Sequence, residues 1–150
     1  MGLFDRLKEA IQPEHGSARD PVRAQQIAAA VLLLEMAHAD NNHDPAEYDE
    51  IRRQLKAHFG LSDGEVEELI AAAAPKARAS VSLYEYLKTL NAGLEMDEKR
   101  GVLEMLWRVA YADNVLDAHE EHLLRDLAEL LYLPHEQFLK AKFAVTGESV

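Results

Sequence analysis

The sequence predicts an all-α fold, a single-domain helical bundle of about seven to eight helices. Three observations support this class. No segment alternates apolar and polar residues with a period of two, so strands are not expected. Apolar residues instead recur at helical spacing between cap and stop signals. A unit made of a helix, an acidic turn, a helix and a short helix occurs twice, as an internal pseudo-repeat.

Length and charge limit the organisation and the partners of the chain. Its 150 residues are enough for one domain with its own core, which we place at residues 21–150 behind an N-terminal arm and linker at 1–20. The net charge of -11 repels a phosphate backbone, so nucleic acid is not an expected partner. A protein partner is expected instead.

Neither a membrane span nor a signal peptide is expected. The longest apolar run, 27–34, is far shorter than the roughly 20 residues that cross a bilayer. The first eleven residues lack an uninterrupted apolar stretch and a small-residue cleavage site. Cysteine is absent, which excludes disulfides and thiol chemistry. A cytoplasmic protein is the resulting expectation.

The N-terminal arm, residues 1–12, is predicted to form a short amphipathic helix. Its apolar face carries Leu3, Phe4, Leu7 and Ile11. Three docking sites remain open for this face: its own domain, a groove of a partner, or peripheral contact with a membrane surface. Residues 13–17 then break the helix and form a linker.

The domain opens with a long helix that starts at Asp20 and Pro21 and runs to about His38. Its apolar content is nearly continuous, so we expect a central, buried helix. A second Asp-Pro pair, Asp44 and Pro45, starts an amphipathic helix that ends at a glycine. The apolar stripe of this helix is Ile51, Leu55 and Phe59, and Gly60 ends the helix.

Two further helices open with an S-x-x-E capping box. The boxes are Ser62 to Glu65 and Ser82 to Glu85. Pro75 is expected to end the first of these helices, and Gly93 the second.

Three more helices complete the prediction, starting near residue 97, at Asp117 and near Pro134. The last one runs to about Val145. Its expected buried side chains are Phe138, Leu139 and Phe143.

Sliding the chain by 73 residues superposes two acidic turns, 39–47 and 112–120. The superposed residues are Asp40 on Asp113, Asn41 on Asn114, Asp44 on Asp117 and Glu47 on Glu120. The similarity continues to the end of the next helix, where 59–62 corresponds to 132–134 with one residue deleted. Two copies predict a pseudo-symmetric bundle in which the helices before the turns pack together and the turns lie at one end.

Two hypotheses explain the carboxylates of these turns. Asp44 with Glu47, and Asp117 with Glu120, fit an Asp variant of the capping box. Asp40 and Asp113 do not fit it, because an acid in the last turn of a helix opposes the helix dipole.

A bound cation would resolve that conflict. Oxygen ligands from Asp40, Asn42 and Asp44 suit Ca²⁺ or Mg²⁺, although Pro45 and Ile51 depart from the EF-hand pattern. The second turn is poorer, because Val115 stands where the first has Asn42. The candidate metal ligands are Asp40, Asn42, Asp44, Glu47, Asp113, Asp117 and Glu120. The other hypothesis is a purely structural turn, in which Asp40 and Asp113 bond to loop amides.

No catalytic constellation is present in the sequence. The serines lack a G-x-S-x-G elbow, and no glycine-rich phosphate loop occurs. Glu35-x-x-His38 has the spacing of half a di-iron site, but Arg108 and Tyr111 stand at the equivalent place of the second copy. His119 and His122 lack the H-E-x-x-H spacing of a zinc hydrolase. We therefore expect a chain that is not an enzyme and that needs no cofactor beyond a divalent cation.

The sequence A-x-A-D-N, at 37–41 and again at 110–114, is followed each time by D-x-x-E. This duplicated element within an all-α layout resembles the TerB-like family, which includes the tellurite-resistance protein TerB and the N-terminal region of the co-chaperone DjlA. The resemblance covers residues 22–145, and the opening residues 1–7 are also similar to the start of many members.

The resemblance implies a helical bundle with acidic residues clustered at the turns and a metal-associated or stress-associated accessory role. Family turns commonly carry Asp-Gly where this chain has Asn41 and Asn114; Asn tolerates the left-handed conformation, so the turn survives. The His-Pro-Asp tripeptide of a J-domain is absent, so that co-chaperone activity is not implied. The alternative is an interaction domain whose acidic turns only cap helices and whose arm makes the contact.

Overall fold

The computed structural model describes residues 21–38, 45–79, 83–112 and 118–147. Within these ranges the chain forms seven helices and no strand, so the predicted all-α class is confirmed. The helices are α3 (Pro21–His38), α4 (Pro45–Phe59), α5 (Asp63–Ala79), α6 (Tyr84–Gly93), α7 (Met96–Ala110), α8 (Ala118–Leu130) and α9 (His135–Thr146). The N-terminal arm, most of both acidic turns and Ser82 lie outside the described residues.

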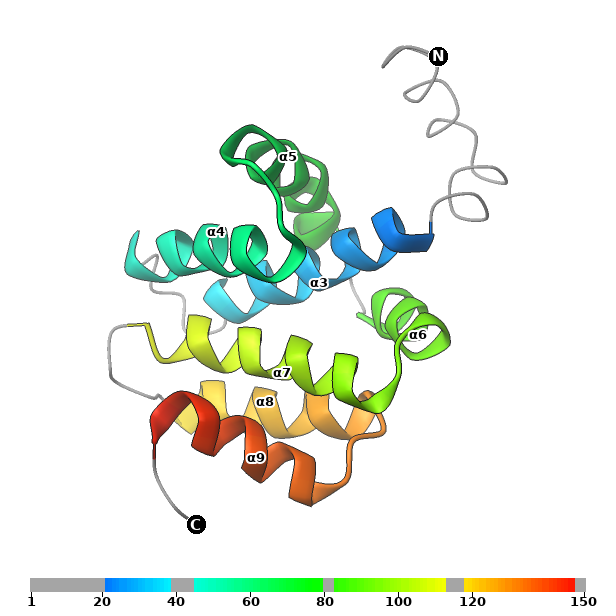
Figure 1. Ribbon diagram of the computed structural model, residues 1–150, viewed down its shortest axis with the longest axis vertical. Coiled ribbons are helices and arrows are strands. Elements are labelled where there is room, and N and C mark those ends of the chain that lie inside the picture. Colours follow the sequence, from blue (N-terminus) through cyan, green and yellow to red (C-terminus); the bar gives the residue numbers. More distant parts are fainter. Residues whose placement is uncertain (1–20, 39–44, 80–82, 113–117, 148–150) are drawn as a thin grey trace.

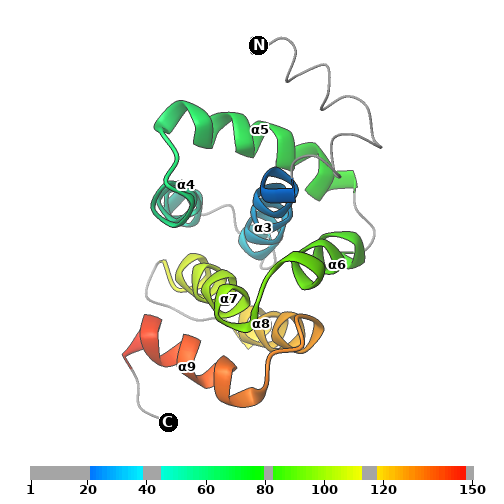
Figure 2. The ribbon, with the colours of Figure 1, turned by 45° about the vertical axis from the view of Figure 1, so that its right-hand side comes forward.

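Helix α3 is the central element of the bundle. Its segment 28–34 is buried throughout, as the continuous apolar run predicted. It contacts α4, α5, α6 and α7, which surround it in Figures 1 and 2. The predicted packing of the two helices that precede the acidic turns, α3 and α7, is therefore confirmed. Among the described helices, none is both long and apolar enough to cross a membrane.

The two copies of the repeat share one pattern of contacts. In the first copy α3 packs against α4 and α5, and in the second α7 packs against α8 and α9. Helix α6 joins the copies and lies against α3. The second copy is anchored by Trp107 of α7 and Phe138 of α9, whose ring centroids are 5.5 Å apart. Both side chains are buried, so α9 is fixed to the core through this pair.

The second helix of each copy ends in the same backbone motif. Gly60 and Tyr132 both adopt the left-handed conformation, with φ of 66° and 58°. The amide of Leu61 then donates to Lys56 O at 3.1 Å, and that of Leu133 to Ala128 O at 2.9 Å, as in a Schellman motif. Gly60 therefore corresponds to Tyr132, and the residue deleted from the second copy lies between Glu120 and this turn.

The prediction that Pro75 ends its helix is wrong. Helix α5 continues to Ala79, with Pro75 inside it. A proline in a helix removes one hydrogen bond and presses on the carbonyl four residues earlier, here that of Ala71. Both residues are exposed, so water replaces the lost donor, while the buried Ala73 and Ala77 keep the helix against the core.

The prediction that Phe143 is buried is also wrong. Its side chain is exposed, whereas Ala141 of the same helix is fully buried. Phe143 follows Phe138 by five residues, which places it roughly 140° around the helix from that buried ring. Phe138 is buried as predicted, and Leu139 packs against the core as a partly buried residue.

Candidate functional site

The helix ends that border the two acidic turns lie on one side of the molecule. Helices α3 and α7 run in the same direction and end there, and α4 and α8 begin there. Figure 1 shows all four ends on its left-hand side. In Figure 2, α3 and α7 lie side by side and both run away from the viewer. The packing of the copies thus brings the borders of both turns to one end of the bundle, as the repeat predicted.

Two acidic side chains enter the core at this end. Glu47 and Glu120 each have only 2% of their surface exposed, and they are the only buried charged residues in the described part of the chain. They occupy equivalent positions of the repeat, in the first turn of α4 and of α8. The same unusual burial therefore occurs in both copies.

The helical stripe explains why these two carboxylates are buried. Glu47, Ile51 and Leu55 follow one another at a spacing of four along the buried face of α4. In α8 the same face carries Glu120 and Leu124. Continuing the apolar stripe of either helix toward its start reaches a glutamate. The stripe of α5 (Leu69, Ala73, Ala77) also reaches one, the exposed Glu65, so the burial of Glu47 and Glu120 depends as well on how α4 and α8 pack in the bundle.

Other glutamates of the chain show what a capping role alone looks like. Glu65 Oε1 accepts from the Ser62 amide at 2.9 Å, and the Glu65 amide donates to Ser62 Oγ at 3.2 Å. Hydrogen bonds from Ser62 hold the pKa of the Glu65 carboxyl below its ordinary value. Glu98 Oε1 likewise accepts from the Glu95 amide at 2.9 Å.

Both of these capping glutamates are exposed to solvent. The burial of Glu47 and Glu120 is therefore not required by a capping box. The sequence interpretation of these two residues as caps did not anticipate it.

The remaining candidate ligands lie outside the described residues. They are Asp40, Asn42, Asp44, Asp113 and Asp117. In the described part of the chain, no group of three or more histidine or acidic side chains is close enough to hold a metal ion. A site at either turn must therefore combine Glu47 or Glu120 with residues of the turn itself.

The histidines at the start of α8 belong to the surface. His122 Nε2 lies 3.4 Å from Asp126 Oδ2, and both side chains are exposed. This pair is one turn apart on the solvent face of the helix, away from the buried stripe of Glu120 and Leu124.

The donor chemistry at this end suits a hard cation. Carboxylates at the start of a helix are favoured by the positive end of its dipole, and a low-dielectric surrounding strengthens their attraction for any cation that approaches. Glu47 and Glu120 supply one such oxygen donor group per copy, and the residue types of the adjacent turns supply more. The residues present are therefore compatible with Ca²⁺ or Mg²⁺.

Comparison with known proteins identifies the family. No curated protein and no solved structure gives a significant match to the chain. The family profile described as "Tellurite resistance protein TerB" matches residues 26–143. This match extends from α3 into α9 and includes both acidic turns. The chain belongs to the TerB family of tellurite-resistance proteins.

Proposed function

We propose that this TerB-family chain is a non-catalytic accessory module of tellurite or stress resistance that binds a divalent cation at each acidic turn. The burial of Glu47 and Glu120 at equivalent positions supports this proposal. A buried carboxylate keeps its charge only where hydrogen bonds or a positive charge offset its desolvation. Both copies keep such a group beside a turn rich in oxygen donors.

The donor types favour Ca²⁺ or Mg²⁺ over softer metals, because every candidate ligand is a carboxylate or amide oxygen. Asp40, Asn42 and Asp44 would complete the site around Glu47, and Asp113 and Asp117 the site around Glu120. The first site has one more donor, since Val115 replaces Asn42 in the second. We therefore expect the first site to bind more tightly.

The activity that we propose is binding, without chemical turnover, in the cytoplasm. Occupation of the turns would fix the starts of α4 and α8 relative to the ends of α3 and α7. If no ion binds, we propose that these carboxylates bind a basic surface of a protein partner, because such a surface offers them the same charge complementarity. The net charge of -11 favours a basic partner over an acidic one.

Thermal melting with and without divalent ions tests the proposal. Saturating Ca²⁺ or Mg²⁺, at about 100 times its Kd, adds about 2.7 kcal/mol for each occupied site, and each site should raise Tm by roughly 5–10 °C. Glu47→Gln with Glu120→Gln should lose most of this gain, because glutamine keeps the shape and removes the charge. Glu68→Gln with Glu136→Gln is the matched control, since both side chains are exposed. No shift with Ca²⁺, Mg²⁺, Mn²⁺ or Zn²⁺ would rule out ion binding.

The second candidate function is a protein-interaction domain whose acidic turns only cap helices. Three exposed apolar side chains near the opposite ends of the helices favour it: Met96, Leu130 and Tyr132. Under this alternative, the Glu47→Gln and Glu120→Gln variants change Tm by the same amount with and without ions.

A further inference from the structure

An exposed apolar surface lies where α6, α7 and the end of α8 meet, and we name it the Tyr132 surface. It consists of Met96, Leu130 and Tyr132, with 47%, 52% and 75% of their surface exposed. Two contacts join its parts. Asn91 Nδ2 donates to Leu130 O at 2.9 Å, and Lys99 Nζ lies 5.6 Å from the Tyr132 ring centroid.

Tyr132 is the most exposed side chain of this surface. Tyrosine is disfavoured at a φ of 58°, where the first copy has Gly60. The ring is mostly exposed, so the core of the fold does not require it. The left-handed conformation itself belongs to the Schellman motif that follows α8. An exposed aromatic ring in such a position is suited to anchoring another segment.

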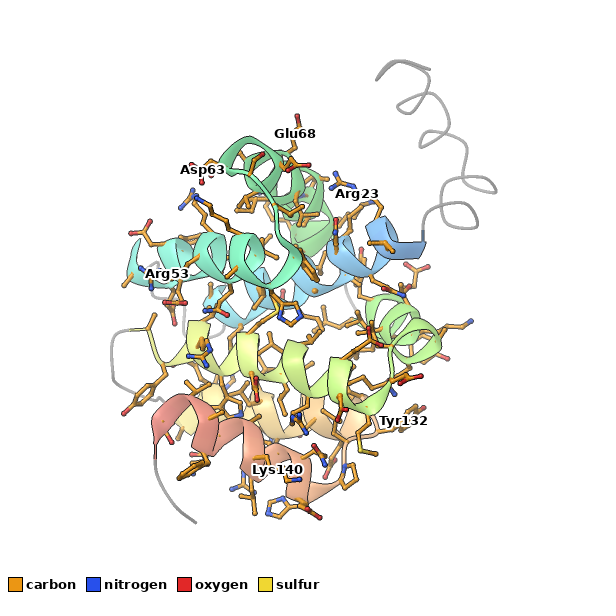
Figure 3. The ribbon with its side chains drawn as sticks, viewed as in Figure 1. Arg23, Arg53, Asp63, Glu68, Tyr132 and Lys140 are labelled. Atoms are coloured by element: carbon orange, nitrogen blue, oxygen red, sulfur yellow. The ribbon has the colours of Figure 1, made fainter. Side chains whose placement is uncertain are left out.

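The domain's first helix begins on the same side of the molecule. In Figure 3, Arg23 near the start of α3 lies at the upper right and Tyr132 at the lower right, with α6 between the two levels. Gln25 of α3 packs directly against Gly93, at the end of α6 and three residues before Met96. Val22, also exposed, extends apolar surface toward this side. The start of α3 therefore lies at the same end of the bundle as the Tyr132 surface, across α6 from it.

The preceding segment has the composition and the reach to cover this surface. Residues 1–12 carry Leu3, Phe4, Leu7 and Ile11 on one helical face. The eight residues 13–20 that follow span up to about 26 Å when extended. The arm has two basic side chains and two acidic ones, Asp5 and Glu9, so opposite charges can pair on both sides: its bases with exposed carboxylates next to the surface, and its acids with Lys99 beside Tyr132. The carboxylates are Glu95, Glu98 and Glu129 on the domain, and the bases are Arg6 and Lys8 on the arm.

We propose that residues 1–12 dock as an amphipathic helix on the Tyr132 surface of the same chain. The apolar face of the arm covers Met96, Leu130 and Tyr132, and Arg6 and Lys8 face the neighbouring carboxylates. This contact is separate from ion binding, since the starts of α4 and α8 lie at the other end of the bundle.

Paramagnetic NMR on the full chain tests this docking. The sequence has no cysteine, so Gly2→Cys places a single nitroxide label on the arm. The label should reduce the amide signals of Met96, Lys99 and Tyr132 at least about twofold, which is the loss expected when half or more of the molecules are docked. Signals at the far end of the bundle, such as that of Phe143, should keep their intensity.

Variants of the arm and of the surface complete the test. Phe4→Asp with Leu7→Asp, and separately Tyr132→Gly with Leu130→Ser, should restore the signals of Met96 and Lys99. Phe143→Ala removes an exposed aromatic ring elsewhere and should leave the twofold loss unchanged. Unreduced signals in the labelled parent chain would overturn the proposal, as would a loss that survives both variants. A loss seen only when labelled and isotope-enriched chains are mixed would assign the contact to a second copy and overturn it too.

Discussion

The two copies of the repeat agree at one end of the bundle and differ at the other. At the end that borders the acidic turns, α4 and α8 bury the equivalent glutamates Glu47 and Glu120. At the other end, the same left-handed turn position holds Gly60 in the first copy and Tyr132 in the second. The residue two positions before it is His58 in the first copy and the exposed Leu130 in the second.

This difference separates two roles within one fold. A buried carboxylate is costly, so its presence in both copies points to a task that both copies perform. An exposed aromatic ring in a disfavoured conformation, in one copy only, points to a task of that copy alone. The two ends of the bundle thus differ in chemistry, although the same helices connect them.

The largest effect should come from the core that both copies share. Leu33 of α3 and Leu106 of α7 are 73 residues apart and fully buried. Replacing either with alanine should lower the free energy of unfolding by about 2–5 kcal/mol, from lost burial and the cavity left behind. Urea denaturation measures the change, with Phe143→Ala as control, since Phe143 is exposed and lies outside the Tyr132 surface. A cost below about 1 kcal/mol for one of the pair would show that the copies do not share the core equally.

The third helices, α5 and α9, should respond differently to one substitution. Pro75 interrupts the hydrogen bonds of α5, and α9 has no proline inside it. Pro75→Ala should raise the free energy of unfolding by about 1–2 kcal/mol, because the carbonyl of Ala71 regains its donor. Thermal melting checks this. A lower Tm would mean that the proline is needed for the path of α5 over α3.

The left-handed turns should react in opposite directions. Gly60→Ala should cost about 1 kcal/mol, since an added Cβ meets no atom within 4 Å and only the backbone is strained. In a chain whose arm is undocked by Phe4→Asp with Leu7→Asp, Tyr132→Gly should instead leave the free energy of unfolding unchanged or raise it by up to about 1 kcal/mol, because it relieves the same strain. Urea denaturation of both variants measures the contrast. If Tyr132→Gly is as harmful as Gly60→Ala, the tyrosine is structural.

The smallest effect concerns His58, which lies against Gly101 of α7. Burial of the imidazole lowers its pKa below 6.5, and the Glu104 carboxylate opposes this shift. Because the pKa of His58 is lower in the folded chain, the unfolded chain takes up the proton first as the pH falls below 6.5. The folded state therefore keeps its full stability above pH 6.5 and loses part of it as the pH falls through the lower folded pKa. His58→Gln should therefore reduce the fall in Tm between pH 7.5 and 5.5. An unchanged slope would contradict the effect of burial.

The sequence was sufficient to predict the elements that carry strong local signals. The apolar run of α3, the Ser62 and Glu65 box and the glycine stop at Gly60 are all found where they were predicted. Pro75 was misjudged because tertiary packing of α5 outweighs the loss of one hydrogen bond. Tyr132 was missed because its left-handed conformation follows from the register of a whole helix, and no residue type signals it.

The candidate site was predictable only in part, for a related reason. A glutamate three residues after an aspartate reads as a cap at the local level, and nothing local distinguishes Glu47 from the exposed Glu65. Glu47 and Glu65 differ in burial because their helices pack against the rest of the bundle in different ways. Glu47 lies on the face of α4 that packs on α3 and α7, and a local pattern does not contain that information.

Calorimetric titration of the full chain with Ca²⁺ and with Mg²⁺ tests the central claim most directly. The wild type should bind two ions, the tighter one lost in Glu47→Gln and the weaker one lost in Glu120→Gln, with Glu68→Gln unchanged. Each loss should weaken its own binding event at least about tenfold, or about 1.4 kcal/mol. No binding of either ion, or binding that neither substitution alters, would contradict cation sites at the two acidic turns.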